Sequence, residues 1–154
     1  MKSTKEDLRW SWYGFDDMEP CLLYDMLSLR EAIFVVEQKC IYQELDGRDK
    51  AALHLVVSDA NQVIACLRVL KPTRPDSRVK IGRVAVKPVW RRRGIARRAV
   101  QMAIENARRR YPSSVLYLEA QSYLREFYES LGFEASGPEF LEDGIPHIPM
   151  QFIS

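Results

Sequence analysis

The chain has few of the residues that build metal sites, disulfide frameworks or membrane spans. Its 154 residues include three cysteines and two histidines. The cysteines, Cys21, Cys40 and Cys66, form no C-x-x-C pair, which disfavours a zinc site and a disulfide framework. No apolar run approaches the ~18 residues of a membrane span, and the polar segment Met1–Arg9 predicts no signal peptide. We therefore expect one cytoplasmic domain, residues 1–154, without a metal or a membrane partner.

The net charge of +2 conceals two unequal parts of the chain. Residues 78–110 contain 12 basic residues and one acidic residue, a net charge of +11. The remaining residues contain 11 basic and 20 acidic residues, a net charge of −9. A run of charge is most often a solvated surface, but a segment this basic also suits a ligand with several phosphates or a nucleic acid. The charge alone leaves these alternatives open.

Apolar periodicity predicts alternating strands and helices within one domain. Helical spacing predicts helices over residues 19–37 and 94–110 and a short helix over 123–131. Alternating or β-branched segments predict strands over residues 8–13, 53–57, 63–70, 79–86, 115–121, 133–136 and 147–153. This order contains a β-α-β unit around the basic segment, which favours a mixed sheet covered by helices.

The most informative segment joins the predicted strand 79–86 to the helix 94–110. It reads Val84-Ala85-Val86-Lys-Pro-Val-Trp-Arg91-Arg92-Arg93-Gly94-Ile95-Ala96. The first N–H groups of a helix have no partner within the helix, and with the helix dipole they favour phosphate binding. Gly94 lets the backbone approach a bulky anion closely. The segment is neither the dinucleotide motif G-x-G-x-x-G nor a P-loop, so these two modes of phosphate binding are not supported.

The segment Arg91-x-x-Gly94-x-Ala96 resembles the Q/R-x-x-G-x-G/A pyrophosphate-binding motif of the GCN5-related N-acetyltransferases, the GNAT family. Phe127-Tyr-Glu-Ser-Leu-Gly-Phe133 is similar to the family's F-Y-x-x-x-G-F element, in the same order and spacing. Further segments resemble the ElaA-type bacterial subfamily, at residues 34–38, 42–47, 81–84, 117–121 and 142–147. The resemblance implies an α+β fold, a mixed, mostly antiparallel twisted sheet of about six to seven strands flanked by about four helices.

The resemblance also implies an activity, the transfer of an acetyl group from acetyl-CoA to a primary amine by direct attack in a ternary complex. The expected pyrophosphate site comprises Arg91, Arg92, Arg93, Gly94, Ile95 and Ala96. Val84, Ala85 and Val86 are expected to pair with the pantetheine arm as an added strand. The Val86 N–H is the expected donor to the thioester oxygen. Tyr128, which matches a family tyrosine near the CoA sulfur, is the expected general acid and a further CoA contact.

The general base is less evident. Some family members use a glutamate on the strand before the pyrophosphate loop, but residues 80–86 contain no acid and have Arg83 instead. Glu37, Glu119 and His147 are the candidates, and a relay through water is the alternative. Glu37 could orient an amine or accept a hydrogen bond at a helix end. His147 is a candidate because the pKa of histidine lies near neutrality.

The acceptor amine is not identified by the sequence. A cationic amine would suit the acidic part of the chain, in particular Glu37, Glu44, Asp46, Asp49, Glu142 and Asp143. We expect no nucleic-acid partner because few aromatic residues interleave with the arginines, although a basic nucleic-acid-binding module remains an alternative. A non-catalytic acyl-CoA sensor is the other alternative. The family resemblance also allows a homodimer, and Cys40 and Cys66 are expected to be small buried hydrophobes without an acyl-enzyme role.

Overall fold

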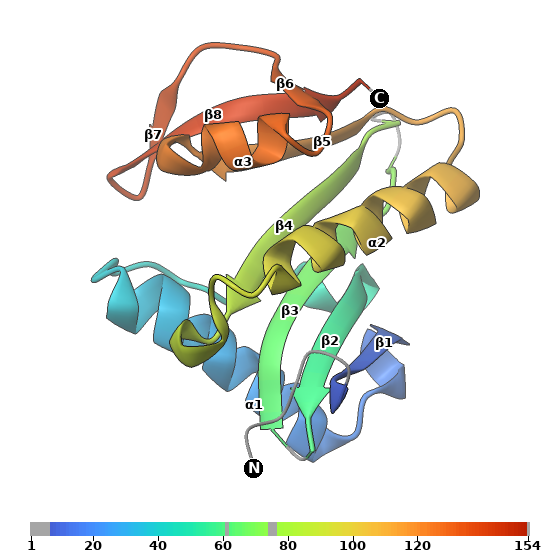
Figure 1. Ribbon diagram of the computed structural model, residues 1–154, viewed down its shortest axis with the longest axis vertical. Helices are drawn as coiled ribbons and strands as arrows, with labels where there is room; N and C mark the ends of the chain where they lie inside the picture. The colour runs from blue at the N-terminus through green and yellow to red at the C-terminus, as the bar shows by residue number, and fades with distance from the viewer. Residues whose placement is uncertain (1–6, 61, 74–76, 154) are drawn as a thin grey trace.

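The fold consists of one mixed β-sheet with helices packed against it (Figure 1). A computed structural model describes residues 7–60, 62–73 and 77–153, so most of the polar segment expected to contain no signal peptide lies outside the described residues. The strands are β1 (Arg9–Gly14), β2 (Leu53–Asp59), β3 (Gln62–Leu70), β4 (Val79–Val86), β5 (Leu116–Gln121), β6 (Phe133–Ala135), β7 (Phe140–Glu142) and β8 (Ile145–Phe152). Their order is β1-β2-β3-β4-β5-β8-β6, and β7 also pairs with β8. Among the described pairs, only β4 and β5 are parallel.

The α-helices of the described residues are α1 (Pro20–Glu31), α2 (Ile95–Arg110) and α3 (Arg125–Glu129). Proline suits the first position of α1, where no helical N–H partner is lost. The segment 19–37, predicted as one helix, consists of α1 followed by a π-helical turn, Ala32–Glu37. The described part has eight strands and three α-helices, where about six to seven strands and about four helices were expected. The class is the predicted one, and no described helix is long and apolar enough to cross a membrane.

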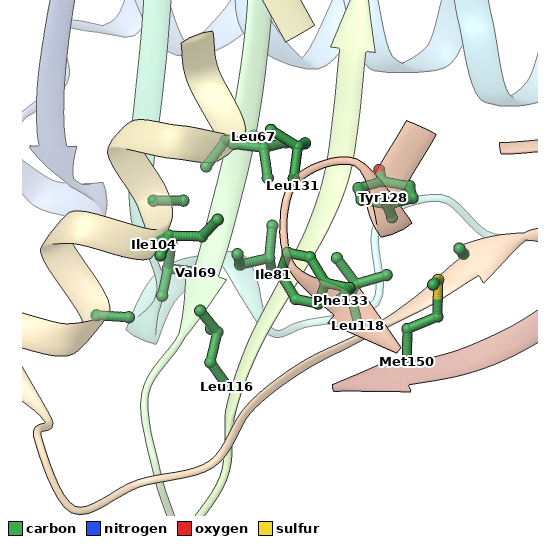
Figure 2. Close-up of a cluster of buried hydrophobic side chains, with 14 of the residues drawn as sticks. Leu67, Val69, Ile81, Ile104, Leu116, Leu118, Tyr128, Leu131, Phe133 and Met150 are labelled. Atoms are coloured by element: carbon green, nitrogen blue, oxygen red, sulfur yellow. The ribbon is translucent and has the colours of Figure 1, made fainter. Parts of the chain in front are cut away.

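Helices α1 and α2 cover opposite faces of the sheet, since successive strand residues point in opposite directions. Leu67 of β3 packs in one cluster with Val100 of α2. Its neighbour Cys66 packs in another cluster with Met26 of α1. Figure 2 shows the α2-side cluster, in which Ile104 of α2 lies with side chains from the central strands.

Strands β4 and β5 separate soon after they begin. Their pairing ends after Lys80 and Tyr117. Farther along β4 the register against β3 shifts, and Arg83 has a φ of 52°, as in a β-bulge. A bulge bends its strand and increases the local twist. Residues 81–86 of β4 therefore diverge from residues 118–121 of β5 (Figure 1), and we call this divergence the β4–β5 splay.

His54 lies fully buried in β2. Its Nε2 is 2.9 Å from the Asp49 carbonyl oxygen, and its Nδ1 has no hydrogen-bond partner. Burial lowers the pKa of this histidine below its usual value, because the charged form loses its hydration. The folded protein therefore binds a proton at His54 less readily than the unfolded chain does.

We expect the free energy of unfolding to fall as the pH drops below about 6.5, since the unfolded chain then protonates His54 and the folded protein does not. For this one group the slope approaches about 1.4 kcal/mol per pH unit. Urea denaturation at several pH values measures the slope, and it should be flatter in H54Q. An unchanged slope in H54Q would contradict the assignment.

Candidate functional site

The loop between β4 and α2 has the backbone of an anion site. It begins with the turn Pro88–Trp90 and ends at Gly94, the N-cap of α2. Arg92 and Gly94 have φ values of 63° and 75°, and left-handed residues among ordinary ones turn successive N–H groups toward one concave side. No side chain caps the first turn of α2. Its N–H groups can therefore donate to an anion.

Buried side chains fix both ends of this loop. Trp90 and Ile95 are buried in a cluster with residues of β2 and β3. Arg92 and Arg93 are exposed, and the Arg93 guanidinium lies 4.7 Å from the centroid of the Trp90 ring. The loop thus presents two cations and an uncapped helix end beside the end of β4.

Arg91 turns back onto the protein. Its Nε donates to the Val86 carbonyl oxygen at 3.0 Å, and its two terminal nitrogens donate to the two carboxylate oxygens of Glu37 at 2.9 and 2.8 Å. Glu37 is the last residue of the π-helical turn, a rare element that often marks functional sites. The structure therefore brings two of the candidate site residues, Glu37 and Arg91, into one bidentate ion pair.

Polar side chains from three segments meet at the end of β5. The Gln38 and Gln121 amides exchange two hydrogen bonds of 3.4 and 3.3 Å. Gln121 is paired in register with His147 of β8. The His147 Nδ1 lies 2.7 Å from the Ile145 carbonyl oxygen, and its Nε2 lies 3.7 Å from Glu142 Oε2. Each glutamine ends a segment that resembles the ElaA-type subfamily, residues 34–38 and 117–121, but that resemblance gave neither side chain a role.

Glu119 and the buried cysteines are held by other contacts. Glu119 of β5 lies 3.2 Å from the ammonium of Lys80, the last residue of β4 that pairs with β5. Burial raises the pKa of the Cys66 thiol to about 12, so this thiol stays protonated. The Cys40 thiol donates to the Asp143 carbonyl oxygen at 3.2 Å, which ties its loop to the turn between β7 and β8.

Tyr128 of α3 lies at the edge of the α2-side cluster, with 6% of its surface exposed. The rings of Phe127 and Phe133 meet its ring edge to face, with centroids 5.0 and 6.0 Å away. In Figure 2 its oxygen points away from Phe133 and Met150. Burial raises the pKa of this phenol above its usual value. The hydroxyl therefore keeps its proton at neutral pH and can act as a donor.

A charge network fills the space between α1, the loop 38–52 and the sheet. Its members are Arg30, Glu44, Asp46, Asp49, Arg68 and Arg83. Arg30, which is 1% exposed, lies 2.7 Å from Glu44 and 2.7 Å from Asp49. Burial alone would raise the pKa of Asp49, but Arg30 and Arg68 outweigh it and hold that pKa below its usual value. The hydrogen bond from Arg68 is the main cause of a lowered pKa at Asp46.

These pairs engage four of the six acidic residues that were expected to suit a cationic amine, all but Glu142 and Asp143. Glu44, Asp46 and Asp49 are each paired with an arginine of the network, and Glu37 is paired with Arg91. A paired carboxylate offers little net attraction to a further cation. The sequence held a signal of the network, since Arg68 interrupts an apolar strand and a buried arginine requires acidic partners.

One cavity, of about 420 Å³, lies between α1 and the ends of β3 and β4, with Glu37 and Lys87 in its lining. It therefore adjoins the Glu37–Arg91 pair. Another, of about 370 Å³, lies near the last turn of α2 and the first residues of β4 and β5. The described residues contain no group of three or more side chains that could hold a metal ion.

Comparison with known proteins agrees with this geometry. Residues 24–154 match the family described as an acetyltransferase (GNAT) domain. The chain is 36% identical over 147 residues to UPF0039 protein sll0451 of Synechocystis sp., across 95% of this chain and 96% of that protein. It is similar to the crystal structure of an acyl-CoA N-acyltransferase from Pseudomonas aeruginosa, with a TM-score of 0.90 and 38% identity over 95% of this chain and 99% of that one. For Escherichia coli ElaA the TM-score is 0.88 and the identity 34%, with the same coverage.

Replacement of Arg30 by methionine should destabilise the protein, because it leaves Glu44 and Asp49 buried with less compensating charge. We expect the free energy of unfolding to fall by about 3–5 kcal/mol. The control is R48M, which removes an exposed arginine from the loop that carries Glu44 and Asp49. It should change the free energy of unfolding by no more than about 0.5 kcal/mol. Urea denaturation measures both variants, and an R30M protein as stable as the R48M protein would show that the network is dispensable.

Proposed function

Because this chain belongs to the GNAT family of acetyltransferases, we propose that it holds acetyl-CoA at the loop after β4 and transfers the acetyl group to a primary amine. The observation that carries this proposal is the position of the anion site, which lies at the end of β4 and therefore directly beside the β4–β5 splay. Acetyl-CoA supplies a pyrophosphate, an extended pantetheine arm and a thioester, so one end of the ligand suits the loop and the other suits the splay.

The pyrophosphate is assigned to the backbone N–H groups from Arg92 to Ala96, with the side chains of Arg92 and Arg93 as added charge. Two residues of this loop have left-handed backbone, and its helix end has no side-chain cap. The buried side chain of Ile95 anchors the first turn of α2, and we assign its N–H to the pyrophosphate. The Arg91 side chain is not assigned to the pyrophosphate, because its guanidinium nitrogens already bond to Glu37 and to the Val86 carbonyl oxygen.

The pantetheine arm is assigned to the free edge of β4 from Val84 to Val86. The Lys87 N–H donates to the Ile64 carbonyl oxygen of β3 at 2.8 Å. The Val86 carbonyl, on the other side of the same peptide plane, therefore points away from β3 and toward the splay. In an extended strand the N–H of a residue shares the edge of its carbonyl. We accordingly assign the Val86 N–H to the thioester oxygen, while Ala85 packs toward α1.

The proposed transfer is direct. The amine nitrogen bonds to the acyl carbon, the carbon–sulfur bond breaks, and the hydroxyl of Tyr128 gives its proton to the departing sulfur. The amine loses a proton in the same process. The carboxylates of Glu37 and Glu119 are each engaged by a cation, Arg91 and Lys80 respectively, so neither is free to contact the amine in this arrangement. His147 and a water relay are therefore the routes that we propose for the amine proton.

The wild-type protein should bind acetyl-CoA in a calorimetric titration and release free thiol with at least one amine of a panel of small amines, free peptide N-termini and lysine peptides. G94V should raise the KM for acetyl-CoA about tenfold, because a branched side chain strains the left-handed backbone of the loop. The control is G144V, which places the same strain in the β7–β8 turn and should leave this KM unchanged. Absence of acetyl-CoA binding would overturn the proposal, and salt-sensitive RNA binding in its place would favour a nucleic-acid module.

Removal of the Tyr128 hydroxyl should slow the reaction without weakening the binding of acetyl-CoA. We expect Y128F to lower kcat about 100-fold, the usual size of a general-acid contribution. Y123F, which removes the hydroxyl of an exposed tyrosine five residues earlier, should keep the wild-type kcat. Steady-state thiol release measures both, and full turnover by Y128F would exclude the general-acid role.

A further inference from the structure

We propose that Glu37 is a positioning residue of the donor site, one that holds Arg91 against the Val86 carbonyl and so fixes the end of β4 and the loop that follows. This inference rests on the proposed acetyl-CoA site. It gives Glu37 a role different from a general base or an amine-binding acid. It also gives Arg91 a role different from a phosphate-binding charge.

The geometry of Arg91 supports this division of roles. Each of its three guanidinium nitrogens makes a hydrogen bond within the protein, two of them to Glu37 and one to Val86. A guanidinium presents these donors in a fixed planar fork, so two contacts with one carboxylate also set the direction of its Nε–H. Because Glu37 and Arg91 are about two-fifths exposed, the ion pair adds little to global stability. Its effect is on the orientation of Arg91.

The peptide that Arg91 contacts is held from two sides. The Lys87 N–H donates to the Ile64 carbonyl oxygen at 2.8 Å, and the Val86 carbonyl of the same peptide accepts from Arg91 at 3.0 Å. The Lys87 carbonyl then accepts from the Trp90 N–H at 2.8 Å, which closes the turn of the loop. The Glu37–Arg91 pair therefore fixes the point at which the free edge of β4 becomes the anion loop.

Glu37 and the next residue reach the two strands that separate at the splay. Glu37 is connected through Arg91 to the end of β4, and Gln38 is bonded to Gln121 at the end of β5. These strand ends are not paired with each other. The end of the π-helical turn, Glu37 and Gln38, thus connects to the ends of both strands and helps to position a ligand between them.

Two accounts of Glu37 give opposite signs for one measurement. If Glu37 positions the loop, its loss disorders the donor site and raises the KM for acetyl-CoA. If instead Glu37 competes with the pyrophosphate for Arg91, its loss frees a cation and lowers this KM. R91K separates the accounts further, because lysine keeps the charge and loses the fork.

The test uses E37Q, R91K and the double variant of the full-length protein, with E31Q as a control that removes the same charge from an exposed position at the end of α1. We expect each single variant to raise the KM for acetyl-CoA about fivefold, the worth of one good ion pair. The double variant should show no larger effect than either single variant, because both break the same connection. The acceptor KM should not change, and E31Q should behave as wild type.

A lower or unchanged KM for acetyl-CoA in E37Q, or independent effects in the double variant, would overturn the inference. So would an effect of E37Q confined to the acceptor KM, which would assign Glu37 to the amine. Hydrogen exchange of the free protein provides a readout without acetyl-CoA. E37Q and R91K should increase deuterium uptake across residues 85–92, and unchanged uptake would also overturn the inference. If the wild-type protein failed to bind acetyl-CoA, the proposed function would fail while this exchange result still decided the positioning role.

Discussion

The rest of the site depends on one interruption of the sheet, the early end of pairing between β4 and β5. A parallel pair that stays paired along its length leaves no backbone donors or acceptors for a ligand. Here the pair ends after Lys80 and Tyr117, and the bulge at Arg83 bends β4. Arg83 is itself ion-paired with Glu44, which Arg30 also holds. The buried charge network therefore supports the strand at the place where it departs from the sheet.

The same charges show how a nearly neutral chain can carry a strongly basic segment. Several cations of that segment are used inside the protein, since Arg83 pairs with the network and Arg91 with Glu37. Arg92 and Arg93 remain exposed beside the uncapped end of α2. The phosphate-binding character of the loop thus comes from a few side chains and from its backbone, rather than from the summed charge. Because most of the acidic residues named above are likewise paired with arginines, their number does not identify the charge of the acceptor.

The sequence was sufficient for the elements with long, regular patterns and for the family. Strand β4 and helix α2 are within a residue of their predicted bounds because alternation and helical spacing continue through them. The three residues of β7 are too short for either pattern, so β7 was missed. The Glu37–Arg91 and Gln38–Gln121 contacts join residues 54 and 83 positions apart. No local sequence pattern encodes contacts between residues so far apart. The candidate residues could therefore be predicted from the sequence, but their contact partners could not.

The most direct measurement of this account is a crystal structure of the protein with CoA bound. We expect the pyrophosphate against the N–H groups of residues 92–96, the pantetheine arm along β4 from Val84 to Val86, and the sulfur within hydrogen-bond reach of the Tyr128 hydroxyl. Arg91 should stay paired with Glu37 in the complex. CoA bound away from the β4–β5 splay, or the pyrophosphate held by an Arg91 that has left Glu37, would contradict it.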